Sequence, residues 1–466
     1  MLNVRPTASA ATARHLSKLI GAATLLAAGA VSSAPLPELW QATQQHAPAL
    51  ASAQAARQAG QSRDDQARAL WRPDVVISGS AGYGRSSSLV RGAQFSAPGF
   101  GSAGDARFET EMRNAHTGSW NVALVQPLYS PQRSAQRALL NISSASAELQ
   151  WQSARQALML QLAEAYFGQA LAERQSVVLR RQQQSVDRIL AEVRERHELG
   201  DLPITDIHEA QAQADDTRAR RLAAETALDL RQTQLADLIG QRLPLGKALL
   251  PTVQPKLPTP DNLEDWQAQA MQHNPQLLLM EKQIQSATQE LARHGPLSGA
   301  QVDLVARTGS EHIHGNHRSA SLSRQSWVGV QFNLPLSTSG LRSAQKREAA
   351  HLADQARAEH ARKRQDVARQ VRAAWLELNT GRSRIQALEA GTAATASRLA
   401  ATRQGVAVGD RRTQDLLDAE YAHAAAQLAL DEARVAWVLH RLQLEALAGQ
   451  LNEDGLHWAW QQTSRK

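Results

Sequence analysis

The chain contains an internal duplication, and no other feature of the sequence limits its possible folds as strongly. The stretch Ser119–Arg137 returns as Ser326–Lys346. In both copies an alternating run ends at a Pro-Leu or Leu-Pro break, and a long segment without proline follows. Equivalent positions in the two long segments stay 209 apart, from Arg133 and Arg342 onwards, without insertion or deletion. The chain is therefore a tandem repeat of one structural unit, and its function should be read from that unit.

Each copy has a long segment that the sequence predicts to be a single helix. Gln132–Glu198 and Leu341–Ala407 are each 67 residues long and rich in Ala, Gln, Arg and Leu. At 1.5 Å per residue each would be a rod of ~100 Å. Val186, Ile189 and Val193 have the apolar spacing of coiled-coil packing. We expect each rod to lie against two short helices placed in line. The short segments are Ala49–Leu70 and Gln276–His294 before the strands, and Thr205–Ile239 and Thr413–Leu447 after the rods.

Each copy also contains two runs with the period-two alternation of strands. The runs are Val75–Tyr83 and Trp120–Leu124 in the first copy, and Gln301–Ala306 and Val328–Leu334 in the second. One face of each run is apolar and the other is small or polar. This pattern fits a half-buried antiparallel sheet, and it also fits the wall of a membrane β-barrel. The first copy has about 20 extra residues, which we place in a loop in the Gly/Ser-rich stretch Arg85–Gly118.

Four strands alone form an open sheet, and this limits how one chain could sit in a membrane. Unpaired strand edges in hydrocarbon would leave backbone groups without hydrogen bonds, at a cost of several kcal/mol each. If the strands lie in a membrane, several protomers must therefore close a barrel together. The helices would then project from one rim of that barrel.

The N-terminus has the features of an export signal. Three basic residues precede the apolar run Leu19–Val31, which at 13 residues is too short to span a bilayer. We divide the chain into a signal peptide (1–30), a first repeat (31–240), a Pro-rich linker (241–260), a second repeat (261–451) and a C-terminal tail (452–466). Removal of residues 1–30 lowers the net charge from +7 to +4, so nucleic acid is not an expected partner. The chain has no cysteine, which excludes disulfides and thiolate metal sites.

The export signal, the paired strands, the two long helices and the duplication together resemble the TolC family of outer-membrane channel proteins. The resemblance implies an α+β membrane protein that forms a homotrimer. Four strands from each protomer would build a 12-stranded outer-membrane β-barrel, and the helices a coiled-coil barrel across the periplasm. It also implies a passive duct with no enzymatic activity and no cofactor. Its expected partners are a periplasmic adaptor (membrane fusion) protein, an inner-membrane ABC transporter or other pump, and outer-membrane lipid.

The resemblance leaves the exported substrate open. The chain resembles members that serve type I secretion of protein toxins such as adenylate cyclase-haemolysin, and we favour this function. The alternative is an efflux component for drugs and other small molecules. A further alternative is a structural coiled-coil protein of the envelope, although such a protein does not need two amphipathic strand pairs. Motifs of phosphate-binding loops, serine hydrolases and zinc proteases are absent from the sequence.

The resemblance also identifies candidate gate residues at the ends of the long helices. In that family a glycine turn is followed by aspartates that surround the periplasmic entrance, and an arginine helps to hold the closed state. We expect Arg411 to hydrogen-bond near Thr205 or Asp206. The family's usual tyrosine falls at Val406, so this contact would be weaker or differently built here. The matching residues are Gly200, Thr205 and Asp206 in the first copy, and Gly409, Arg411, Asp415 and Asp418 in the second.

Other reactive or aromatic residues have simpler interpretations. Asp415 and Asp418 share one helix face. Acids in a first helical turn are common because they favour the helix dipole, but the resemblance makes the gate interpretation the preferred one for this pair. The group Glu311, His312, His314 and His317 has ligand chemistry, yet a solvated histidine loop is the better interpretation because metal sites need fixed second-shell partners. Trp120 and Trp327 are either interfacial aromatics or ordinary packing residues.

Overall fold

The computed structural model describes residues 35–240, 249–253, 255–295, 297–315 and 320–463. The predicted signal peptide and part of the predicted linker lie outside these residues. Both copies have the same order of elements: two short helices, two strands, a long helix and a return helix. The first copy consists of α1 (Leu36–His46), α2 (Pro48–Ala69), β1 (Asp74–Ala97), β2 (Gly101–Tyr129), α3 (Pro131–Glu198) and α4 (Ile204–Ile239). The second consists of α5 (Leu263–His273), α6 (Pro275–Arg293), β3 (Gln301–His314), β4 (Ala320–Asn333), α7 (Leu341–Ala407) and α8 (Thr413–Leu447), and α9 (Glu453–Gln461) follows it.

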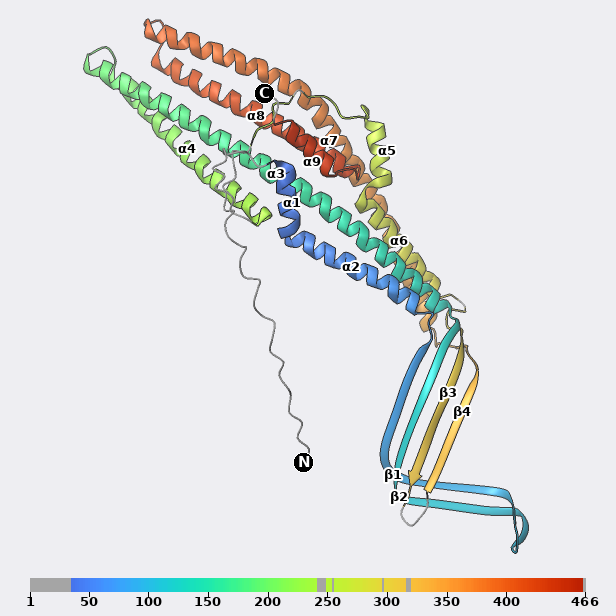
Figure 1. Ribbon diagram of the computed structural model, residues 1–466. Coiled ribbons are helices and arrows are strands. Elements are labelled where there is room, and N and C mark those ends of the chain that lie inside the picture. The colour runs from blue at the N-terminus through green and yellow to red at the C-terminus, as the bar shows by residue number, and fades with distance from the viewer. Residues whose placement is uncertain (1–34, 241–248, 254, 296, 316–319, 464–466) are drawn as a thin grey trace, which may run out of the picture.

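The helices form a long rod, and the sheet continues from one end of it (Figure 1). α2 and α4 both pack along α3, and α6 and α8 both pack along α7. The predicted packing of one long helix against two short helices in line is therefore confirmed. The turns at the far ends of α3 and α7, away from the sheet, are called the tips below.

The main hydrophobic core lies in the middle of the rod. It contains the fully buried tryptophans Trp40, Trp266 and Trp437, and it joins α1, α5 and α9 to the long helices. The residues predicted as a C-terminal tail include the helix α9, whose Glu453 accepts hydrogen bonds from Trp40 Nε1 (3.3 Å) and from Arg155 (2.8 Å). The bond from Trp40 and those from Arg155 and Gln44 lower the pKa of Glu453. α9 therefore ties the C-terminal end to α1 and α3.

The four strands form one antiparallel sheet in the order β1-β2-β3-β4. β1 and β2 have 24 and 29 residues, whereas β3 and β4 have 14 each, so the extra residues of the first copy do lie in this hairpin. The prediction of a loop over Arg85–Gly118 is wrong. Paired strands continue to a turn at Gly99, which has a φ of 85°. A backbone ladder needs no apolar side chains, so a Gly/Ser-rich run can pair as a ribbon.

Among the described residues, every helix is too short or too polar to cross a membrane.

Candidate functional site

The strand register divides the side chains of the sheet between two unlike faces. The apolar residues of one face, called the apolar face, are 37% to 75% exposed in the protomer: Val75, Ile77, Leu304, Val328, Val330 and Phe332. The opposite face, called the polar face, carries mainly small, amide and charged side chains: Ser78, Ser80, Ser119, Asn121, Arg307, Glu311, Gln325 and Gln331. Exposed apolar residues on one side and polar residues on the other are the pattern of a barrel wall between lipid and a water-filled interior.

The predicted histidine group does not assemble into a site. His312 and His314 lie in strand β3 on the apolar face and not in a loop, with ring centroids 5.9 Å apart. Glu311 lies on the opposite face because consecutive strand residues alternate, and His317 lies outside the described residues. In the described part of the chain, no group of three or more His, Cys, Asp or Glu side chains could hold a metal ion.

Both tips turn at a glycine in the left-handed region. Gly200, between α3 and α4, has a φ of 89°, and Gly409, between α7 and α8, has a φ of 82°. A side chain at either position would be strained, because residues other than glycine rarely adopt such angles. These glycines allow each return helix to fold back along its long helix.

An apolar cluster joins the two tips of the protomer. It contains buried side chains from all four tip helices and is called the tip cluster below. Val406 is only 9% exposed in it. The hydrophobic effect therefore holds the α3–α4 hairpin against the α7–α8 hairpin. The members are Val186, Ile189, Leu190, Val193, Ala210, Ala214, Val406, Leu416 and Leu417.

The polar gate candidates make local hydrogen bonds within their own hairpins. Thr205 Oγ1 donates to Asp206 Oδ1 (3.4 Å). The backbone N–H of Arg412 donates to Asp415 Oδ2 (3.2 Å), which caps the start of α8, and Gln414 Nε2 donates to Asp418 Oδ1 (3.3 Å).

Arg411 does not show the expected bond to the first-copy tip. Its Cγ lies 2.7 Å from the place where a β-carbon on Gly405 would be, so the side chain folds back against the end of α7. Within the described protomer, Arg411 makes no side-chain hydrogen bond to Thr205 or Asp206. At the position of the family's usual tyrosine, Val406 instead packs in the apolar tip cluster.

Polar contacts that the sequence reasoning missed join the hairpins above the tips. Ser185 on α3 donates to Glu420 on α8 (2.8 Å), and Arg403 on α7 donates to the same oxygen (2.6 Å). The guanidinium of Arg220 on α4 lies 5.0 Å from the ring centre of Tyr421 on α8, a cation–π contact between the return helices of the two copies. Tyr421 is the one tyrosine in the Ala-rich helix α8, and this was the sequence feature that could have indicated such a contact.

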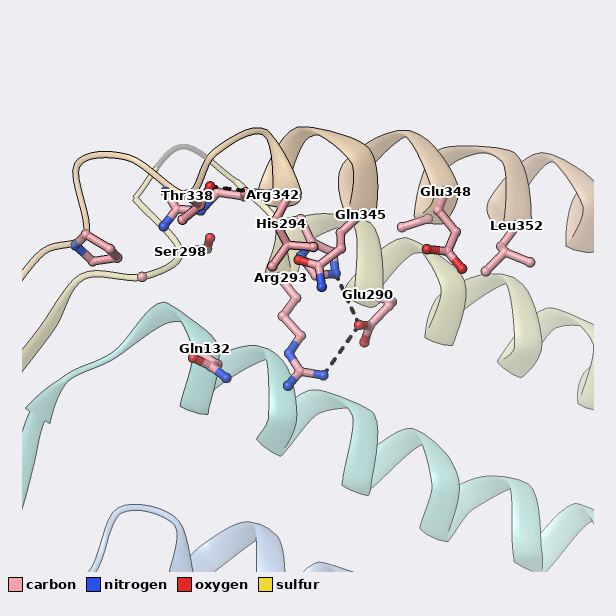
Figure 2. Close-up of a pocket in the computed structure, with 14 residues that line it drawn as sticks. Gln132, Glu290, Arg293, His294, Ser298, Thr338, Arg342, Gln345, Glu348 and Leu352 are labelled. Carbon is pink, nitrogen blue, oxygen red and sulfur yellow. Dashed lines mark hydrogen bonds and ion pairs between the residues drawn. The ribbon is translucent and has the colours of Figure 1, made fainter.

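A polar pocket lies where the rod meets the sheet, between α3, α6 and α7 (Figure 2). Its volume is about 560 Å³. Arg293 and His294 both lie 3.4 Å from Glu290 Oε1, as the dashed lines in Figure 2 show. Its basic groups are thus balanced by carboxylates, with Glu348 on the α7 side. Both ion pairs lie within α6 and the residue that follows it. The lining has mixed charges, without the features of a nucleophilic centre.

This two-faced sheet, continued by a helical rod with paired tips, defines an outer-membrane channel protomer with a periplasmic helical part. The model of the family described as outer membrane efflux protein matches residues 39–241 and 266–450. The chain therefore belongs to the outer membrane efflux protein family. Members are passive ducts, so the chain is a transport component and not an enzyme.

The chain is similar in sequence to bacterial secretion and outer-membrane proteins. The proteases secretion protein PrtF of Dickeya chrysanthemi is 27% identical over 313 residues, which are 66% of this chain and 68% of that protein. Outer membrane protein TolC of Escherichia coli is 26% identical over 359 residues, 74% of this chain and 71% of that protein.

Solved structures share the fold. The outer membrane protein VceC of Vibrio cholerae superposes with a TM-score of 0.70 at 18% identity, covering 89% of this chain and 96% of that chain. The CmeC outer membrane channel of Campylobacter jejuni gives a TM-score of 0.72 at 13% identity, covering 93% and 90%.

Proposed function

We propose that three copies of this chain form the outer-membrane exit duct for type I secretion of a protein. An inner-membrane ABC transporter and a periplasmic adaptor protein would deliver the cargo. The observation that carries this proposal is the similarity to PrtF, which is named as a proteases secretion protein. The alkaline protease secretion protein AprF of Pseudomonas aeruginosa, 26% identical over 312 residues, supports the same class of cargo. A protein toxin such as adenylate cyclase-haemolysin is the particular cargo that we favour.

The open sheet supports assembly from several protomers. Within the described residues, β1 and β4 each pair on one side only. Leu352 and Leu376 on α7 are also 50% and 52% exposed in the lone protomer. In a trimer, strand pairing between neighbours closes the barrel, and a neighbouring helix covers these leucines.

A secretion assay separates protein export from efflux. We expect a deletion strain to lose a specific protein from the culture medium, and the full-length gene to restore it. Mass spectrometry of the medium identifies the cargo, and growth in the presence of drugs is measured in parallel. An unchanged set of secreted proteins together with increased drug sensitivity would show that the duct serves small-molecule efflux and not protein secretion.

We further propose that Asp415 and Asp418 surround the periplasmic entrance of the duct. Three protomers would place six carboxylates around one axis, and such a ring attracts cations. Replacing both residues by asparagine keeps their shape and removes the charge. We expect the preference of the channel for cations over anions to fall by about threefold or more, with little change in resting conductance.

Reversal potentials of the purified protein in planar bilayers under a salt gradient measure this preference. The control is the pair Asp64→Asn and Asp65→Asn on α2, which removes the same number of charges far from the tips. Equal selectivity changes in both double variants would show that Asp415 and Asp418 have no special position at the entrance.

A further inference from the structure

Trp327 is a large aromatic residue on the polar face of the sheet, where the other residues are mainly small or hydrophilic. It is 44% exposed, and its backbone pairs with that of Arg307 on β3. Trp120 stands at the equivalent place in the first copy, yet its pairing with Gly79 and Ser310 puts it on the apolar face. Since the apolar face of an outer-membrane channel contacts lipid, Trp120 faces lipid and Trp327 faces the interior of the duct.

The strand is built to accommodate the indole of Trp327. A β-carbon on Gly329 would lie 2.5 Å from Trp327 Cζ2, which is shorter than any real contact of this kind. Only glycine at this position lets the ring lie along the strand in this way. The indole therefore lies against the sheet, among polar residues of its own strand β4 and of β2 and β3.

Polar side chains surround the indole in a shallow hollow. The hollow has a volume of about 770 Å³, and Asn121, Gln325 and Gln331 contribute to its lining. Trp120 also borders it, but its pairing with Gly79 and Ser310 places its side chain on the opposite face. Arg307 donates a hydrogen bond to Gln331 Oε1 (3.4 Å), which directs its guanidinium along the same face. An indole and a guanidinium both stack on aromatic rings, and the amides can bond to a peptide backbone.

We propose that Trp327 and Arg307 form a contact site for the aromatic side chains of an unfolded polypeptide that passes through the duct. This inference rests on the proposed function of protein secretion. A single indole among polar groups binds an aromatic ring weakly, which suits a cargo that must leave again. Three protomers would present three such sites around one lumen, so that a long chain always has one within reach.

Planar bilayers that contain the purified protein test this site directly. Two unstructured 20-residue peptides of equal charge are added on the extracellular side, one with four tyrosines and one with serines in their place. We expect the tyrosine peptide to block the current for longer, by about three- to tenfold, as expected for one aromatic contact. Trp327→Ala should shorten its blocks to the level of the serine peptide, and Trp327→Phe should preserve most of the difference.

The equivalent tryptophan supplies the matched control. Trp120→Ala removes the same side chain from the lipid-facing side and should leave both block times unchanged. Equal block times for the two peptides in the wild type, or an unchanged tyrosine-peptide block in Trp327→Ala, would overturn the contact site while leaving the duct intact. If neither peptide enters the channel, the proposed polypeptide duct itself fails, and the contact site fails with it.

Discussion

Replacement of Val406 by aspartate is expected to raise the single-channel conductance of the reconstituted protein severalfold. Val406 is 9% exposed and packs in the tip cluster with Leu416 and Leu417 of α8 and with residues of α3. A carboxylate buried there without a partner costs several kcal/mol. Separation of the two hairpins hydrates the charge and relieves this cost. Since the hairpins frame the proposed entrance, their separation should widen it.

Val408, two residues further on, provides the control for this substitution. It is 73% exposed at the end of α7, so Val408→Asp adds the same charge to the same tip without burying it. We expect Val408→Asp to leave the conductance close to that of the wild type. Equal conductance increases in both variants would attribute the effect to charge and not to packing.

Arg411→Ser should have a smaller effect than Val406→Asp. Within the described protomer, Arg411 lies against Gly405 and has no side-chain bond to Thr205 or Asp206. Because Arg411 is exposed, its charge should contribute little to holding the hairpins together. The same bilayer recordings compare the two variants. A larger conductance increase in Arg411→Ser would indicate that a polar contact across protomers controls the entrance.

The helices and the duplication could be predicted from the sequence because their signals are local. The boundaries of α7 and α8 agree with the predicted segments, since Gly340 precedes α7 and Gly409 lies between the two helices. The long hairpin of β1 and β2 could not be predicted, because its Gly/Ser-rich residues have no apolar alternation. Pairing with a neighbouring strand is what orders it.

The tip could be located from the sequence, but its contacts could not be derived. Glycines and helix-start acids mark the turns in the chain itself. The tip cluster brings together residues as distant as Val186 and Leu417, and the Arg220–Tyr421 contact spans two different repeats. Which side chains meet depends on the rotation of each helix about its axis, and heptad spacing alone leaves that rotation open. The sequence places Val406 where the family usually has a tyrosine, but its burial in the tip cluster could not be derived from that position.

Replacement of Trp437 by alanine should destabilise the helical rod far more than the same truncation at the exposed Trp327. Trp437 is 2% exposed in the main core, and its Nε1 donates to the carbonyl oxygen of Leu378 (3.1 Å). Its ring also lies against Gly381, where a β-carbon would be 3.0 Å from Cδ1. Loss of a buried tryptophan costs about 3–5 kcal/mol, and the lost hydrogen bond adds about 1 kcal/mol.

Circular dichroism at a fixed heating rate measures this loss in detergent. We expect the temperature at which half of the helical signal is lost to fall by about 5–10 °C. Trp437→Phe retains most of the packing and should show a smaller decrease. Trp327→Ala removes the same side chain from a 44% exposed position and should leave the temperature nearly unchanged. If both alanine variants lose half of their helical signal at the same temperature, the packing of α8 on α7 does not depend on Trp437.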